Sequence, residues 1–179
     1  MSRTSRLLPT VVTRSSLRLT PAQRGWNPGR LFSILDEVKG PTGHGPSSSH
    51  TIAPQRIAFH EVFEALGGRP DAVRVELYNS FATTGAGQGT RGAIVAGLLG
   101  FAANDPDTVR APELAKTLRI EWVTQIVPDT ETDPIDRHPN RLVIEARRGL
   151  AKIRVEALSI GGGNYEVVTR AADRRRAAG

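Results

Sequence analysis

Apolar residues recur at helical spacing from residue 51 to residue 66, and they alternate with polar residues from residue 72 to residue 78. The first pattern predicts a helix that ends at Gly67-Gly68, because glycine is a common helix terminus. The second pattern predicts a strand with one buried face. The apolar positions are Ile52, Phe59, Phe63 and Leu66 in the helix, and Val73, Val75 and Leu77 in the strand.

The remaining sequence continues this mixture of elements. Residues 31–38 form a short apolar element before Gly40-Pro41, residues 93–101 are too uniformly apolar for a surface helix, and residues 112–118 predict a helix that begins with proline. Together these elements predict one α+β domain at about residues 31–170, in which helices pack on a single mixed sheet. The other expected elements are strands at 119–127, 141–146, 152–158 and 165–169, and an acidic, proline-containing loop at 128–140.

The net charge of +6 is concentrated at the N-terminal end of the chain. Six of the 24 basic residues are arginines within residues 1–30, which contain no acidic residue, so 18 basic residues face 18 acidic residues in the rest. Arg174, Arg175 and Arg176 make a second basic end in a short tail, residues 171–179. The neutral body argues against nucleic-acid binding by the fold, although a basic tail could contact an acidic partner.

The arginine-, serine- and threonine-rich residues 1–30 also have the composition of an organellar presequence. A disordered tail is the favoured interpretation, which predicts a cytoplasmic protein, and an organellar matrix is the alternative. No apolar run approaches the roughly 20 residues that span a bilayer, so no membrane segment is expected. The chain has no cysteine, which excludes disulfides, thiolate zinc sites and cysteine-ligated iron–sulfur clusters within it.

Candidate chemistry begins at Gly45–Thr51, which reads GPSSSHT and directly precedes the predicted helix. A hydroxyl of Ser48, Ser49 or Thr51 could cap that helix, but one residue suffices for a cap. A helix N-terminus surrounded by hydroxyls also suits a carboxylate or phosphate, and His50 could transfer a proton near neutral pH. The pattern alone leaves a cap and a ligand site equally open.

A second candidate is the glycine-rich segment 83–92, TTGAGQGTRG, in which Gly87, Gly89 and Gly92 fit the dinucleotide-binding pattern G-x-G-x-x-G. The preceding strand should end near Tyr78, about eight residues too early for the tight turn that such a site requires. The acidic residue at the expected distance, Glu113, falls in a predicted helix. Nucleotide binding is therefore a minor alternative.

The histidines do not predict a metal site. His44, His50 and His60 lie in one region, but no acidic residue accompanies the first two at a ligand spacing. His60 is expected on the helix surface, and His138, in DRHPNR, could be a structural or a site residue.

Several motifs in order resemble the β subunit of the iron–sulfur-dependent L-serine dehydratases. They are GPSSSHT, LYNSFATTGAGQGT, GLLGF, HPN and SIGGGNYEV, and the resemblance covers about residues 31–168. It implies a β-elimination that converts L-serine to pyruvate and ammonia. It also implies a [4Fe–4S] cluster with one open iron, which acts as a Lewis acid and is ligated by cysteines of a separate α subunit.

The resemblance also assigns roles to individual residues. The serine motif and the helix amides would hold the substrate carboxylate, and His50 would orient the substrate or handle a proton. The HPN motif would contribute to the same site, whereas the glycines of SIGGG would provide a turn beside it. The implied residues are His50 as catalytic; Ser47, Ser48, Ser49, Thr51, Gln88, His138 and Asn140 as substrate-binding; and Ser159, Gly161, Gly162 and Gly163 in the SIGGG run.

Two positions depart from the family pattern. Gln88 stands where a histidine is usual, and Arg91 where an aspartate is usual. Glutamine cannot exchange a proton near pH 7, and arginine reverses the charge. Because the family fold also resembles the allosteric substrate-binding domain of some phosphoglycerate dehydrogenases, the alternative is a non-catalytic domain that binds a small amino acid or regulates.

Overall fold

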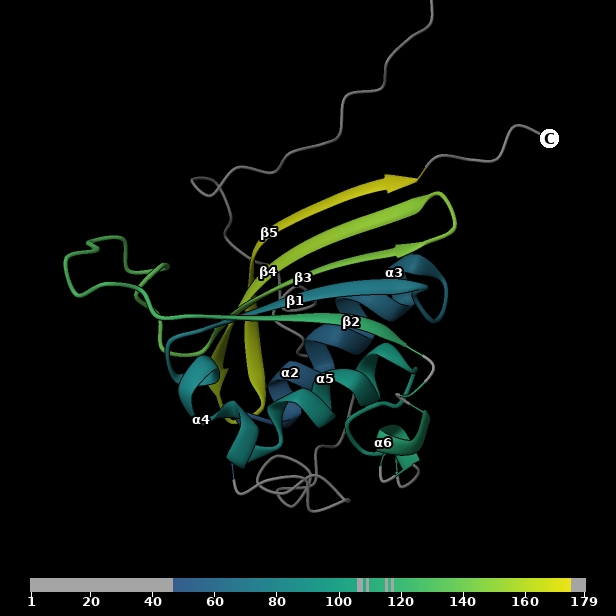
Figure 1. Ribbon diagram of the computed structural model, residues 1–179, viewed down its shortest axis with the longest axis horizontal. Helices are drawn as coiled ribbons and strands as arrows, with labels where there is room; N and C mark the ends of the chain where they lie inside the picture. The colour runs from purple at the N-terminus through teal and green to yellow at the C-terminus, as the bar shows by residue number, and fades with distance from the viewer. Residues whose placement is uncertain (1–46, 106–107, 109, 115, 117, 175–179) are drawn as a thin grey trace, which may run out of the picture.

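The computed structural model describes residues 47–105, 108, 110–114, 116 and 118–174. It has one five-stranded mixed sheet with the described helices on one face, which confirms the predicted α+β class (Figure 1). The basic residues 1–30, His44 and the element expected at 31–38 lie outside this part of the chain. Within it, no helix has the length and apolar character needed to cross a membrane.

The strands bring several chain segments to one edge of the sheet. Only β1 and β2 pair in parallel, so their C-terminal ends meet at this edge, and the antiparallel strands place the start of β3 and the β4–β5 turn there as well. The order β2-β1-β3-β4-β5 comprises β2 (Arg119–Gln125), β1 (Ala72–Tyr78), β3 (Arg141–Arg148), β4 (Ala151–Gly161) and β5 (Asn164–Arg174). All five predicted strands are confirmed, and β5 extends beyond its predicted end at residue 169 because it pairs with β4 as far as Arg174.

The predicted helix at 51–66 is confirmed, but its middle is a π-helix. It consists of α2 (Ile52–Arg56), η1 (Ile57–Phe63) and α3 (Glu64–Leu66), and it ends at Gly67 with a left-handed φ of 70°. The π-helix changes the angular spacing of side chains, so the buried face differs from the predicted one except at Ile52. The buried apolar residues are Ile52, Ala53, Ile57, Ala58 and Val62, whereas Phe59 and Phe63 stack on each other and are partly exposed.

The predicted buried helix is α5 (Thr90–Leu98), which crosses the first helix at Gly97. A Cβ at Gly97 would lie 2.4 Å from the carbonyl oxygen of Gln55 and 2.7 Å from Cβ of Ala58. The two helices therefore require a glycine at this crossing. Gln55 adds polar contacts, because its Nε2 donates to the carbonyls of Phe101 and Ala102.

The glycine-rich segment is helical, and the minor alternative of a dinucleotide-binding turn is wrong. Helix α4 (Ser80–Gln88) begins two residues after the end of β1, and Gly87 lies in its last turn. Gly89, with φ 77°, forms the break between α4 and α5, and Gly92 lies within α5. Low helix propensity is outweighed here by packing, since Phe81 and Gly85 are buried.

The remaining segments differ little from expectation. Helix α6 (Ala111–Leu114) is shorter than the helix expected at 112–118. Residues 128–140 form turns without a helix or strand, as predicted, and this segment projects from the body at the left of Figure 1.

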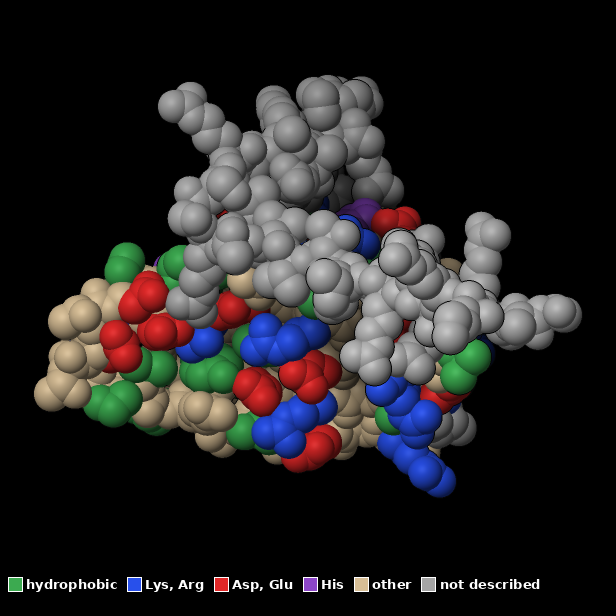
Figure 2. All heavy atoms as spheres, turned by 90° about the horizontal axis from the view of Figure 1, so that it is seen from above, with side chains coloured by type: hydrophobic (Ala, Val, Ile, Leu, Met, Phe, Trp, Pro, Cys, Tyr) green, Lys and Arg blue, Asp and Glu red, His purple; other side chains and the backbone are tan. Residues whose placement is uncertain are grey.

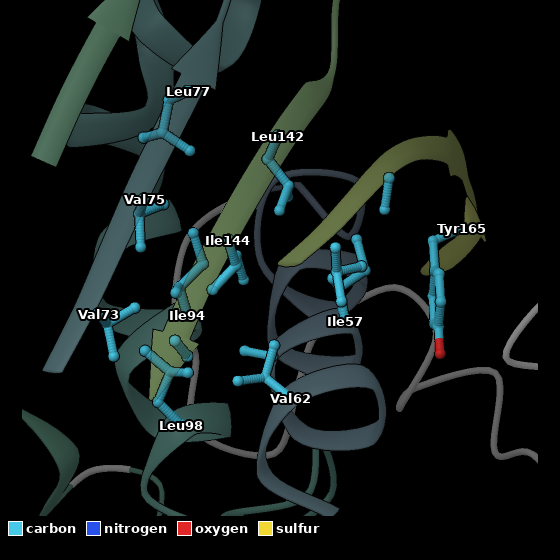
Figure 3. Packing of buried hydrophobic residues seen from close by; sticks show 14 of the residues in the cluster. Ile57, Val62, Val73, Val75, Leu77, Ile94, Leu98, Leu142, Ile144 and Tyr165 are labelled. Carbon is cyan, nitrogen blue, oxygen red and sulfur yellow. The ribbon is translucent and has the colours of Figure 1, made fainter. Parts of the chain in front are cut away.

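The two faces of the sheet have different chemistry. On the inner face, Val73, Val75, Leu77, Leu142 and Ile144 pack against helix residues such as Ile57, Val62, Ile94 and Leu98 (Figure 3). On the outer face, acidic and basic side chains alternate across the strands, with Arg74 paired to Glu121 and Arg154 to Glu145 (Figure 2). The inner face therefore makes the core, and its edge can position a site.

Candidate active site

His50 lies in a tight turn that leads into α2. The turn is closed by the backbone N–H of His50, which donates to the carbonyl of Ser47 at 3.1 Å, and by the hydroxyl of Thr51, which donates to the same carbonyl at 2.8 Å. Thr51 occupies the N-cap position but makes no side-chain cap hydrogen bond. The predicted side-chain cap is therefore wrong for Thr51, whose hydroxyl folds the turn instead.

Both ring nitrogens of His50 are bound by hydroxyl groups. Nδ1 lies 3.1 Å from Oγ of Ser49 and 3.3 Å from Oγ of Ser47. Nε2 lies 3.0 Å from Oγ1 of Thr84 and 3.3 Å from Oγ of Ser80, both on α4. A hydroxyl can donate or accept, so this environment accommodates a proton on either ring nitrogen.

The surroundings of His50 favour its neutral form. The residue is 8% exposed, and its ring packs edge-on against Phe81 at a centroid distance of 5.1 Å. Burial lowers the pKa of His50 below its usual value. A neutral imidazole with two hydroxyl-bound nitrogens can accept a proton at neutral pH, which is the property needed in a general base.

The start of α4 connects this cluster to the HPN motif. The backbone N–H of Ser80 donates to the carbonyl of Pro139 at 2.8 Å, while the hydroxyl of Ser80 lies within hydrogen-bond distance of His50. The turn before α4 depends on Asn79, which adopts a positive φ of 52°. The structure thus brings together the serine motif, the residues after β1 and the HPN motif, which are far apart in the sequence.

Asn79 holds three backbone groups of the segment that follows β2. Its Nδ2 donates to the carbonyls of Asp136 and His138 at 3.1 and 3.0 Å, and its Oδ1 accepts from the N–H of Val127 at 2.9 Å. Sequence reasoning missed Asn79, Ser80 and Thr84. The available signal was the polar run that directly follows β1, because residues at the ends of parallel strands gather at one edge of a sheet.

His138 and Asn140 directly precede β3 at this edge. The N–H of Asn140 donates to Nδ1 of His138 at 3.1 Å, which places the ring proton of a neutral His138 on Nε2. Burial lowers the pKa of His138 below its usual value. Among the described residues no hydrogen bond or ring contact joins the two histidines, which are connected through Ser80 and Pro139.

Asn140 and Ser159 form a polar pair beyond the end of the inner-face core. The backbone N–H of Ser159 donates to the carbonyl of Asn140 at 2.9 Å, and side-chain alternation along β4 places Ser159 on the same face as the buried Val155 and Ala157. Ser159 is only 2% exposed, yet its buried Oγ and the buried Oδ1 of Asn140 have no hydrogen-bond partner among the residues that the structure describes. Such atoms usually bind something, so this pair is a place for a polar ligand group.

The glycine run forms the β4–β5 turn, as predicted. Gly161, Gly162 and Gly163 have φ values of 96°, 59° and 74°, which other residues rarely adopt. The turn contacts the first helix, because Nη1 of Arg56 donates to the carbonyl of Gly163 at 2.9 Å. The run therefore has a structural role beside the cluster.

Gln88 lies on the His50 side of α4, but Arg91 makes its contact elsewhere. Ser80, Thr84 and Gln88 are four residues apart and share one helix face, and Oε1 of Gln88 is buried without a partner. Arg91 instead places its guanidinium over the ring of Trp122 on β2, 5.1 Å from the centroid. The charge of Arg91, which is opposite to that of the usual aspartate, therefore lies at the β2 edge of the sheet.

The first helix offers few free amides to an anion. The N–H groups of Ala53 and Gln55 donate to the carbonyls of Ser48 and Thr51, and Pro54 has no N–H. The available donors near His50 are therefore mainly hydroxyls. The described residues also contain no group of three or more His, Asp or Glu side chains that could hold a metal ion.

Comparisons with known proteins identify the family of this chain. The sequence profile of the family called serine dehydratase beta chain matches residues 33–171, so the chain belongs to that family. It is 35% identical over 136 residues to a probable L-serine dehydratase, beta chain, of Bacillus subtilis, covering 75% of this chain and 58% of that one. It is also 35% identical over 135 residues to the L-serine dehydratase, beta chain, of Peptoniphilus asaccharolyticus, covering 74% and 58%.

A third relative is a longer protein. The L-serine dehydratase of Mycobacterium bovis is 41% identical over 107 residues, which cover 55% of this chain but 23% of that one. The present chain thus spans less than two thirds of the length of the relatives it matches.

Proposed function

We propose that this chain is the β subunit of an L-serine dehydratase, which converts L-serine to pyruvate and ammonia. The observation that carries the proposal is the buried His50 with hydroxyls on both ring nitrogens, in a chain of the serine dehydratase beta chain family. We infer the reaction from the relatives, which are called L-serine dehydratases.

The unpaired polar atoms suggest how the chain would hold an amino acid. The hydroxyls of Ser47 and Ser49 can donate to the substrate carboxylate. The ammonium group needs acceptors, and Oδ1 of Asn140 and Oγ of Ser159 are buried atoms that lack a partner. His50 would then orient the substrate or hold the proton that leaves its α-carbon.

The [4Fe–4S] cluster would belong to a separate, cysteine-bearing α subunit. The donor set of this chain does not fit the cluster, since the sequence has no cysteine and the described residues form no cluster of other metal ligands. The much greater length of the Mycobacterium bovis relative is consistent with an activity that needs more than this chain.

Gln88 favours a second candidate function, a regulatory domain that binds a small amino acid without chemistry. Its amide can form hydrogen bonds through the unpaired Oε1, but it cannot exchange a proton near pH 7. Saturable serine binding by the isolated chain, together with no turnover in the complete complex, would favour this function.

The test compares two histidines of the same region. In the complex of both subunits, His50→Ala should lower pyruvate formation from L-serine by about 10²-fold or more, the usual contribution of a positioned proton-transfer group. His60→Ala is the matched control, because His60 is partly exposed and pairs with Glu64. Equal loss, or no loss, in both variants would contradict the proposed role of His50.

A further inference from the structure

We propose that residues 126–140, here called the projecting arm, are the docking element for the subunit that completes the active site. The partner would present a basic surface with an apolar side chain. This inference rests on the proposed function, and it adds which surface of the chain makes the contact.

The projecting arm is long but internally ordered. It connects β2 to β3 without a helix or strand and extends away from the body (Figure 1). Oε1 of Glu131 accepts the N–H groups of Thr132 and Asp133 at 2.8 and 3.0 Å, and Oδ1 of Asp133 accepts that of Ile135 at 2.8 Å. Loops of this length within compact domains usually have a function.

Its two ends are fixed to the active-site edge. Asn79 bonds Val127 near the start and Asp136 and His138 near the end, and Ser80 bonds Pro139. These bonds hold Asn79 in a strained backbone conformation with a positive φ. An element so fixed loses little conformational entropy on binding, which favours association.

The base of the projecting arm offers an apolar contact beside a hollow. Ile126 is 62% exposed, the highest value among the exposed large hydrophobic residues of the described chain. A hollow of about 320 Å³ lies beside it, lined by residues that include Asn79, Thr83, Ile126 and Pro139. Pro139, which also lines the hollow, accepts the N–H of Ser80, and Ser80 contacts His50, so a side chain that fills the hollow would contact a segment that supports the His50 cluster.

The charge of the projecting arm favours a basic partner. The arm carries Asp129, Glu131, Asp133 and Asp136 against one arginine, Arg137, and Asp136 pairs with Arg141 at 3.2 Å. Asp129 and Glu131 are therefore the acidic residues offered to a partner. Hydrogen bonds from the backbone amides of Asp133 and Thr132 lower the pKa of Glu131, so it stays ionised at neutral pH. Complementary charges steer association and discriminate between partners.

The experiment measures binding of the full chain to the cysteine-bearing subunit, without oxygen. Ile126→Asp should weaken binding at least about tenfold, as truncation of interface anchors does. Leu150→Asp is the matched control, since Leu150 is 57% exposed in the turn between β3 and β4, at the opposite end of the sheet (Figure 1).

A second pair of variants tests the charge. Asp129→Lys should weaken binding at low salt, with a smaller difference at high salt because exposed charges are screened. Glu113→Lys, which makes the same change on the exposed residue of α6, should bind as the wild type does.

The outcomes separate the two proposals. If the wild-type chain does not bind the cysteine-bearing subunit, both the proposed function and this inference are wrong. If the wild type binds and Ile126→Asp and Asp129→Lys bind equally well, only the inference is overturned. Loss of self-association in Ile126→Asp, with unchanged binding to the cysteine-bearing subunit, would make the arm a contact between copies of this chain and would also overturn it.

Discussion

The hydroxyl groups that surround His50 position its ring without a charged contact among the described residues. Ser47 and Ser49 come from the same turn as His50, whereas Ser80 and Thr84 come from α4. The GPSSSHT motif identified His50 and its nearest serines in advance. It could not identify Ser80 or Thr84, because their contact with His50 exists only after α4 packs against the start of α2.

The lowered pKa of His50 predicts a pH-dependent stability. Below the usual histidine pKa of about 6.5, the unfolded chain binds a proton that the folded chain resists. The free energy of unfolding is therefore highest above that pH, and part of it is lost as pH falls from about 6.5 towards the lower pKa of His50 in the folded chain. His138 contributes in the same direction.

Urea unfolding at about pH 7.5 and about pH 5.5 checks this expectation. The wild type should lose more free energy of unfolding over this interval than His50→Asn does. His60→Asn should retain the wild-type dependence, because the burial that lowers the pKa acts on His50. A wild type and a His50→Asn variant with the same pH dependence would contradict a buried, neutral His50.

Asn79 combines an unfavourable backbone conformation with three favourable side-chain bonds. Asn79→Ala keeps the positive φ and removes the bonds, whereas Asn79→Gly removes the bonds but tolerates the φ. Alanine should therefore reduce stability more than glycine, by about 1–2 kcal/mol. Urea unfolding of the two variants decides this, and an alanine variant as stable as the glycine variant would refute the strain.

At the scale of elements, the crossing of α5 and the first helix determines how the helix layer packs. Gly97 allows the contact with Gln55 and Ala58, at the junction where the α-helix becomes a π-helix. π-Helices often occur at functional sites, and this one lies within the helix that follows the His50 turn.

Gly97→Ala should destabilise the chain by about 1–3 kcal/mol, because the added methyl meets backbone atoms that cannot move aside. Gly92→Ala is the control on the same helix, since its Cβ would enter open space. That variant should be neutral or more stable by up to about 1 kcal/mol. Thermal or urea unfolding gives both values, and similar effects at the two positions would contradict the close crossing.

The sequence predicted an element correctly where its local residue pattern and its tertiary packing favour the same structure. Alternation in β1 and the uniform apolarity of α5 were sufficient, because burial by tertiary packing agrees with those local patterns. For α4 the local signal was misleading, because residues 85–92 contain four glycines. The helix forms through packing against Thr90 and the sheet edge, which the sequence pattern does not show. The π-helix had no sequence signal, because the apolar spacing of residues 51–66 fits an ordinary α-helix.

For the whole molecule, the structure is consistent with one part of a composite active site. Its sheet edge gathers hydroxyls, two histidines and unpaired polar atoms, but the described residues provide no metal-binding cluster. The relatives called beta chain extend well beyond the matched length. This combination supports the proposal that the activity depends on a second subunit.

The most direct test is an anaerobic assay of this chain with the cysteine-bearing subunit and a reconstituted cluster. Pyruvate should form from L-serine only when both chains are present, and it should be lost with His50→Ala but not with His60→Ala. A stable two-chain complex that forms no pyruvate, or pyruvate formed equally well without this chain, would contradict the account.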